Sequence, residues 1–306
     1  MVIDAPRDVH LAIIRKRFPG ISLADMVLHA GGEHFVYVVE GMVSYRFPQK
    51  PRPIPLVRAH AIAWLAATGA IPFALPACEI EHDDEFGIWF ERVRYLPGVP
   101  LTPEVAATFG PGEMRTIARH MGAFLTTLHA LPLEPARALG MDEMDPTDFW
   151  DYMENNPNAY PRVRQTLWPV LPPEERAWIA RLFEGFIARA RRTPLPLAIR
   201  HNDMHPYHII VDPAFHELAG VIDFTWRIAD PANDFKAFDH YGPEFVAEVY
   251  AHYGGTVDAG FEARRLFYTG HDVVFRLVRS YAGGDTEAIA EHHARLSAYI
   301  RAHPVR

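Results

Sequence analysis

The sequence contains little cysteine and little lysine. Cys78 is the single cysteine among 306 residues, so neither an intramolecular disulfide nor a zinc site built on several thiolates is possible. A chain without disulfides is compatible with a reducing compartment, and we therefore expect a cytoplasmic protein. Lysine occurs only at Lys16, Lys50 and Lys236, so arginine carries most of the positive charge.

The sequence also lacks a long apolar segment. No stretch approaches the roughly 18 apolar residues of a membrane span, and charged residues interrupt the N-terminal segment before a signal-like run develops. The formal net charge of −8 argues against a surface that binds nucleic acid. We therefore expect neither a membrane nor a nucleic acid as a partner, and the sequence leaves the oligomeric state open.

The first third of the chain is expected to form a β-rich lobe. The length of 306 residues suggests two lobes or domains. Residues 35–39 and 42–47 are rich in β-branched and aromatic side chains and flank Glu40-Gly41, which predicts a hairpin. A helix is expected over 56–68, a strand over 88–93 and a linker over 97–100. These patterns predict a first lobe of residues 1–95.

Residues 96–306 are expected to form a second, mainly helical lobe, which makes the fold class α+β. Apolar side chains recur at a helical period in several segments. These segments are 114–128, 174–191, 244–253 and 262–281. One island, residues 197–223, lacks this period and follows Pro194 and Pro196.

The island places chemically active side chains at one end of a predicted hairpin. Two apolar runs, 209–211 and 218–222, flank a turn that contains Asp212-Pro213. His208 enters the first strand and Asp223 leaves the second, so both are expected at the open end of the hairpin. Asp203 lies five residues before His208. Phosphoryl transfer needs such a set: one carboxylate accepts a proton from the attacking hydroxyl, and two further groups bind the metal of a metal–triphosphate.

The island and its surroundings resemble the aminoglycoside phosphotransferases, which are relatives of the protein kinases. The matching segments are 201–208, 221–224, 230–235, 45–48, 97–102 and 241–246. The resemblance is to the 2″-phosphotransferase branch, which also has asparagine after the histidine and a histidine at the position of His208. Macrolide phosphotransferases share the second feature.

The resemblance implies a bilobal, kinase-like fold in which residues 1–95 bind the nucleotide and residues 96–306 carry the catalytic and acceptor sites. It implies transfer of a γ-phosphate from ATP or GTP, with Mg²⁺, to a hydroxyl of an aminoglycoside-like molecule. Asp203 would be the base, and His208 and Asp223 would bind the metal. The nucleotide would contact Gly31, Gly32, Arg46, Phe90, Glu91, Arg92 and Val93. His201, Asp230 and Asp234 are expected to be structural.

Two departures from the family pattern concern the nucleotide and the acceptor. Arg46 stands where most relatives have a phosphate-binding lysine, and His60 stands where a helix glutamate normally pairs with it, which leaves Glu79 or Glu91 as substitutes. The acidic cluster that would bind a polyamine is reduced to Asp239-His240, and Trp226-Arg227 follow Asp223-Phe224. The expected acceptor residues are Asp203, Asp239, Trp226, Asp148 and Asp151.

Three other hypotheses stay open at this point. The protein could phosphorylate another hydroxylated metabolite or antibiotic, such as a macrolide, since the acidic cluster is reduced. It could be a pseudokinase that binds nucleotide without catalysis, since Arg46 and His60 replace the usual pair. It could be a metal-dependent hydrolase, because histidine and aspartate cluster within residues 201–208.

Overall fold

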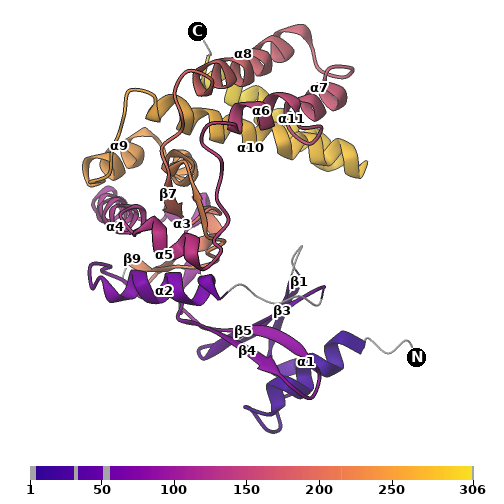
Figure 1. Ribbon diagram of the computed structural model, residues 1–306, viewed down its shortest axis with the longest axis vertical. Coiled ribbons are helices and arrows are strands. Elements are labelled where there is room, and N and C mark those ends of the chain that lie inside the picture. Colours follow the sequence, from indigo (N-terminus) through magenta and orange to yellow (C-terminus); the bar gives the residue numbers. More distant parts are fainter. Residues whose placement is uncertain (1–4, 31–33, 51–55, 215, 305–306) are drawn as a thin grey trace.

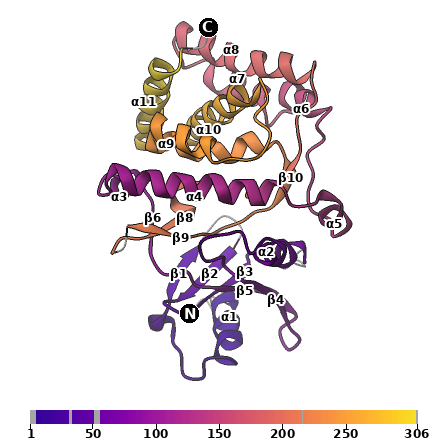
Figure 2. The same ribbon diagram turned by 90° about the vertical axis from the view of Figure 1, so that its left-hand side faces the viewer.

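A computed structural model describes residues 5–30, 34–50, 56–214 and 216–304. The chain forms a small β-rich lobe and a larger, mainly helical lobe (Figures 1 and 2). The predicted α+β class with this division of secondary structure is therefore confirmed. In the described ranges, no helix has the length and apolar character needed to cross a membrane.

The small lobe is built on an antiparallel sheet of five strands in the order β1-β2-β3-β5-β4. The strands are β1 Val27–Ala30, β2 His34–Val39, β3 Val43–Pro48, β4 Cys78–Asp83 and β5 Ile88–Arg94. The predicted hairpin is present as β2 and β3, and Gly41 in its turn has the positive φ of 74° that glycine adopts without strain. The sequence patterns missed β1 and β4.

Alternation along the strands gives this sheet two different faces. The outer face carries Tyr45, Phe47 and Phe90, which pack with Ile14 of helix α1 (Ala5–Arg15) in an aromatic core. A short 3₁₀ helix, η1 (Leu23–Asp25), joins α1 to the sheet. Since successive side chains of a strand point to opposite faces, the inner face carries Arg46 and Glu91.

Helix α2 (Val57–Ala67) lies between β3 and β4 in sequence but packs on the other lobe. Its buried side chains Val57, Ala61, Ile62 and Leu65 belong to the core of the large lobe. The backbone also joins the lobes nearby, because the amide of Ala74 donates to the carbonyl of Ala219 at 3.2 Å. The proposed division at residue 95 stays a prediction, since α2 packs across it.

The large lobe contains two short sheets surrounded by helices. The sheets are β6-β8-β9 and β10-β7, formed by β6 Val99–Pro100, β7 Ala198–Arg200, β8 Ile209–Asp212, β9 Glu217–Val221 and β10 Arg227–Ala229. The smaller helices are α3 Pro103–Ala106, α5 Leu133–Ala138, α6 Phe149–Asn155, α7 Tyr160–Leu167, α9 Pro243–Ala251, η2 Pro206–His208 and η3 Pro231–Tyr241. The long helices are α4 Pro111–His129, α8 Pro173–Ala190, α10 Phe261–Gly283 and α11 Thr286–Ala302.

This arrangement sets the island of residues 197–223 at the junction of the lobes. Strands β8 and β9 pair as the predicted hairpin and lie between the small lobe and α4 (Figure 2). The four predicted helices are present as α4, α8, α9 and α10. The patterns missed α7 and α11, and α11 packs along α10 at the edge of the lobe.

Candidate active site

The structure brings Asp203, His208 and Asp223 together at the open end of the β8–β9 hairpin. The imidazole of His208 lies between the two carboxylates, with Nδ1 3.7 Å from Oδ2 of Asp203 and Nε2 3.4 Å from Oδ2 of Asp223. The Asp203 side chain is 54% exposed, so an incoming hydroxyl can reach it. The hairpin therefore produces the convergence that the spacing predicts.

The tautomer of a neutral His208 follows from its hydrogen-bond partner. Its Nδ1 lies 2.7 Å from the backbone carbonyl of Asp203, which can only accept a hydrogen bond. The ring proton of a neutral imidazole therefore resides on Nδ1, and the lone pair of Nε2 faces Asp223. This is the tautomer in which histidine can bind a metal, held by a hydrogen bond at its other nitrogen.

His201 joins the two catalytic segments from inside the protein. Its side chain is fully buried, Nε2 lies 2.8 Å from the carbonyl of Ile222, and Nδ1 accepts the amide of Asp203 at 3.3 Å. One neutral imidazole satisfies both bonds, and burial lowers the pKa of His201 below its usual value of 6.5. The ring thus fixes the backbone of Asp203 relative to the residue before Asp223.

Asp234 holds the same loop from its other side. Its buried carboxylate accepts the amides of His201 at 2.8 Å and Asn202 at 3.1 Å, together with His129 Nε2 at 3.2 Å. Asn202 has a φ of 69°, a left-handed conformation that such a network can maintain. Burial alone would raise the pKa of Asp234, but the bond from His129 and the charge of Arg200 hold it at about 2.

Asp230 performs a comparable task one turn earlier. Its carboxylate caps η3 by accepting the amide of Ala232 at 3.1 Å. It also accepts hydrogen bonds from Arg264 at 2.7 Å and Tyr268 at 2.9 Å. Asp230 and Asp234 are both fully buried, so their contacts are structural and lie beneath the active loop.

The donor set at His208 and Asp223 fits a magnesium ion that also binds phosphate. Among the residues that the structure describes, no three metal-ligating side chains form a ready-made cage. Mg²⁺ usually takes one or two protein ligands and completes its shell with water and substrate phosphates. Asp223 supplies a carboxylate oxygen, and the lone pair of His208 points toward it.

Arg46 reaches this site from the inner face of the small-lobe sheet. Its guanidinium hydrogen-bonds to Oδ1 of Asp223, and its Nη1 lies 3.8 Å from Glu91. Of the two substitute carboxylates, Glu91 is therefore beside Arg46, whereas Glu79 pairs with Arg92. His60 is exposed and its Nδ1 lies 3.0 Å from the carbonyl of Leu56, so it does not face Arg46.

The segment 90–93 is divided between the two faces of the sheet. Phe90 is 4% exposed and stacks on Phe47 at 5.2 Å in the core, and Arg92 pairs with Glu79 and Glu81 on the same outer face. The structure therefore does not bring Phe90 and Arg92 to the inner face, because strand alternation turns them away from Arg46. Glu91 and Val93 do lie on the inner face. Gly31 and Gly32 lie outside the described residues.

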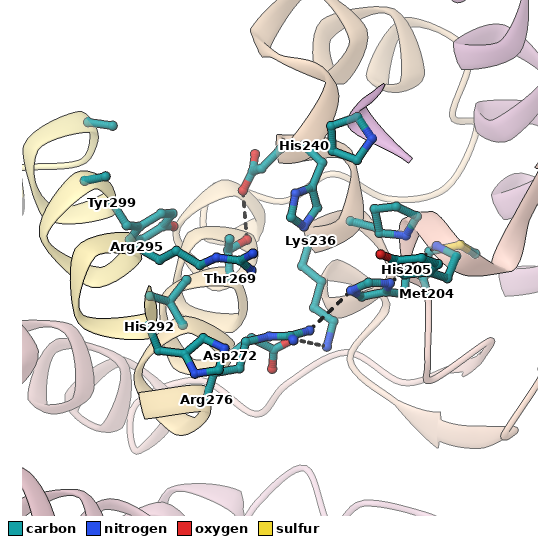
Figure 3. A pocket seen from close by; sticks show the side chains of 18 of the residues that line it. Met204, His205, Lys236, His240, Thr269, Asp272, Arg276, His292, Arg295 and Tyr299 are labelled. Atoms are coloured by element: carbon teal, nitrogen blue, oxygen red, sulfur yellow. Dashed lines mark hydrogen bonds and ion pairs between the residues drawn. The ribbon is translucent and has the colours of Figure 1, made fainter. Parts of the chain in front are cut away.

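A cavity of about 720 Å³ adjoins the turn that follows Asp203 (Figure 3). Met204 and His205 form its wall on the side of the base, and α10 and α11 form the opposite wall. Its polar lining includes Lys236, Asp239, His240, Thr269, Asp272, Arg276, His292 and Arg295. The cavity is thus placed to hold an acceptor near Asp203.

Of the predicted acceptor residues beyond Asp203, the structure brings only Asp239 to this cavity. Trp226 is 5% exposed and stacks on Phe224 at 4.6 Å, so its ring belongs to the core. Asp148 stands at the N-terminal boundary of α6, and Asp151 accepts a hydrogen bond from Asn155 at 2.6 Å. Figure 2 shows α6 and α11 at opposite edges of the large lobe.

Sequence reasoning missed the contribution of α10 and α11 to the wall of this cavity. Arg276 lies in the predicted helical segment 262–281, but its position on the cavity side had no local signal. Arg295 lies on α11, whose apolar positions Ile289, Leu296 and Ile300 pack against the core and have helical spacing. That spacing could have revealed the helix, although not the cavity beside it.

Comparison with known proteins decides the family. Residues 29–267 match the phosphotransferase enzyme family. This chain belongs to that family. The predicted family resemblance is thereby confirmed, and so is the general prediction of a phosphotransferase that acts on hydroxyl groups. No curated protein sequence matches the chain.

Solved structures of the same fold include aminoglycoside and macrolide enzymes. A type IIIa aminoglycoside 2″-phosphotransferase complexed with GDP and kanamycin is 20% identical, with a TM-score of 0.75 over 95% of this chain and 97% of that chain. A type IIa enzyme with streptomycin and ATP is 16% identical, with a TM-score of 0.63 over 97% of both chains. A macrolide 2′-phosphotransferase from Brachybacterium faecium is 20% identical, with a TM-score of 0.60 over 97% and 99%. These likenesses confirm the kinase-like fold.

Proposed function

We propose that this protein transfers the γ-phosphate of ATP or GTP to a hydroxyl of an aminoglycoside-like small molecule, with Asp203 as the base. The observation that supports this most directly is the convergence of Asp203, His208 and Asp223, both carboxylates lying within 4 Å of one imidazole. The small lobe would bind the nucleotide through Arg46, and the large lobe would bind the acceptor. The complexes of solved relatives with GDP, ATP and kanamycin support the two ligand classes.

In the proposed reaction, Asp203 orients the acceptor hydroxyl and takes its proton. The acceptor oxygen forms a bond to the γ-phosphorus while the bond from that phosphorus to the β-phosphate oxygen breaks, which releases the nucleoside diphosphate. Little covalent chemistry falls to the protein, so positioning and charge neutralisation supply most of the rate. His208 and Asp223 would hold Mg²⁺, which supplies charge neutralisation for the phosphates.

The test is turnover by the purified protein with Mg²⁺ and either nucleotide. Kanamycin and gentamicin are offered as acceptors, and mass spectrometry detects an added phosphate. Asp203→Asn serves as the matched inactive variant. We expect phosphorylated product from the wild type only. If nucleotide binds but neither hydrolysis nor transfer occurs with any acceptor, the pseudokinase hypothesis replaces this proposal.

The lining of the cavity favours a second candidate acceptor, a hydroxylated molecule with fewer amines, such as a macrolide. Asp239 accepts hydrogen bonds from Arg265 and from Thr269 at 2.8 Å. Asp272 pairs with Lys236 at 2.7 Å, and Glu291 pairs with Arg295 at 2.6 Å. These carboxylates are already engaged by cations of the protein, so a polycation gains less from them.

Arg276 adds a cation to the same wall. Its Nη2 donates to Nε2 of His205 at 3.2 Å, and within the described chain it has no carboxylate partner. Burial first, and the charge of Arg276 second, lower the pKa of His205 to about 4, so the imidazole stays neutral. A guanidinium beside His205 on the cavity wall disfavours an ammonium group at that position.

A comparison of acceptors separates the two candidates. Kanamycin and erythromycin are compared as acceptors of the wild type and of Arg276→Ala, with exposed Arg279→Ala as the control on the same helix. If the acceptor carries few amines, wild-type kcat/KM is higher for erythromycin. If it is a polyamine, kanamycin is preferred and Arg276→Ala raises its kcat/KM further.

A further inference from the structure

The pairing register sets Arg46 and Glu91 side by side. They are directly opposite partners on the antiparallel strands β3 and β5, so both side chains point to the inner face of the sheet. Glu79 is opposite Arg92 and therefore lies on the outer face. The register alone makes Glu91 the carboxylate available to Arg46.

Glu91 is buried between two guanidinium groups. It is 2% exposed, its Oε1 lies 2.9 Å from Nη1 of Arg58, and its Oε2 lies 3.8 Å from Nη1 of Arg46. A buried carboxylate is costly unless it is paired, and here each oxygen faces a different arginine. Arg58 and Arg46 share this one carboxylate, and Arg46 also pairs with Asp223, so the positive and negative charges of the network balance.

Arg58 comes from α2, the helix that packs on the large lobe. The helix thus contributes a cation to the ion-pair network, and the carboxylate comes from strand β5. The network runs from Arg58 through Glu91 to Arg46 and ends on Asp223 of the hairpin. It therefore connects the sheet to the large lobe at two points, through α2 and through Asp223.

We propose that Glu91 is the positioning residue for Arg46, and that Arg58 fixes Glu91 in place. Glu91 restrains the guanidinium of Arg46 on the inner face, where it reaches Asp223 and from where it can donate to nucleotide phosphates. The carboxylate on the strand thereby performs the task for which a helix carboxylate was expected at position 60. This inference rests on the proposed function, because it assumes that the site binds a nucleoside triphosphate.

The first experiment compares Glu91→Gln with Glu79→Gln, which makes the same change on the opposite face. Dissociation constants for Mg·ATP and Mg·GTP are measured by calorimetry, together with the acceptor KM and the thermal midpoint. Because Glu91→Gln removes the negative charge that pairs with Arg46 at 3.8 Å, we expect nucleotide binding to weaken by about tenfold. We expect the acceptor KM to be unchanged and Glu79→Gln to bind like the wild type.

A double-variant cycle shows whether Glu91 acts through Arg46. If it does, Glu91→Gln weakens nucleotide binding in the wild type but adds nothing once Arg46→Ala is present. If the effects of the two variants add in full, Glu91 has only a structural role. The same conclusion follows if nucleotide affinity changes only in proportion to the thermal midpoint. Should Glu91→Gln fail to fold, Arg58→Gln provides the same cycle from a side chain that is 22% exposed.

The outcomes separate this inference from the proposed function. If the wild type binds neither nucleotide, the proposed function fails. If the wild type binds nucleotide and Glu91→Gln binds equally well, the proposed function stands and the positioning role of Glu91 is refuted.

Discussion

The loop that carries Asp203 and the inner face of the small-lobe sheet are held in different ways. Around Asp203, the restraints end on the backbone: Asp234 accepts two loop amides, and His201 joins the amide of Asp203 to the carbonyl of Ile222. Around Arg46, the restraints are ion pairs between side chains on separate elements. The first region fixes the path of the chain, and the second fixes only the position of a charge.

This difference explains which residues can be exchanged. A carboxylate that binds two consecutive amides must occupy one position relative to the loop, so a change of residue loses the geometry. A charge pair can form with a carboxylate from another element, because any strand position or helix turn that faces the cation can supply it. Arg46, which stands where the family resemblance implies a lysine, and Glu91, the strand carboxylate that faces it, lie in the region that tolerates such rebuilding.

The largest effect is expected at the base itself. Replacing Asp203 with asparagine removes the proton acceptor and keeps the shape of the side chain, so transfer should fall by about 10³-fold, roughly 4 kcal/mol of barrier. Nucleotide affinity should stay at the wild-type level, because Asp203 acts on the acceptor. Single-turnover rates and nucleotide calorimetry measure the two quantities.

The contrasting variant is Asp223→Asn in the same region. It should weaken binding of Mg²⁺-nucleotide as well as transfer. If Asp203→Asn lost nucleotide binding while transfer persisted, the roles of the two carboxylates would have to be reversed.

The second prediction concerns Asp234, whose carboxylate accepts the backbone amides of the Asp203 loop. Asp234→Asn places an amide group against loop amides that need an acceptor, and it removes the partner of His129. We expect the free energy of unfolding to fall by about 3 kcal/mol, the scale of breaking a buried charge pair. Denaturant titration measures this, with exposed Asp142→Asn as the control. A loss below that of the control would mean that the loop does not depend on its anchor.

The same contrast explains what the sequence could reveal. Asp203, His208 and Asp223 are close in sequence and joined by one hairpin, so local pattern was enough to place them. Glu91 and Arg46 are brought together by the pairing of β3 with β5, and Arg58 joins them only through the packing of α2. The cavity wall of α10 and α11 depends on tertiary packing in the same way. Local patterns carry no information about such contacts, and they also gave no sign that Trp226 would turn into the core.

The third prediction concerns the ion pairs around Arg46. Arg46→Lys keeps the positive charge but cannot contact Glu91 and Asp223 with a planar fork, so nucleotide affinity should fall by about tenfold at most. Arg46→Ala should cost more, because it leaves Glu91 with one partner. Arg92→Lys, on the outer face, is the control. If Arg46→Lys behaved like Arg46→Ala, charge alone would not suffice, and the tolerance inferred for this region would be refuted.

The smallest expected effect concerns how the free energy of unfolding depends on pH through a histidine of the small lobe. His10 of α1 stacks on Phe47 at 4.1 Å and contacts the hydroxyl of Tyr37, and burial lowers its pKa from 6.5 to about 4. The unfolded chain therefore binds a proton that the folded chain refuses, and stability is lost as pH falls from 6.5 toward 4. His10→Gln cannot titrate, so its loss of stability between pH 7 and pH 5 should be smaller by about 2 kcal/mol.

His201 is buried in the large lobe and its pKa is also lowered, but it is present in both proteins. The difference in pH dependence between the wild type and His10→Gln therefore reports the contribution of His10 in the small lobe. Exposed His60→Gln is the matched control and should keep the wild-type pH dependence. Urea titrations at the two pH values measure the difference. An unchanged pH dependence in His10→Gln would show that His10 binds its proton in the folded aromatic core as readily as in the unfolded chain.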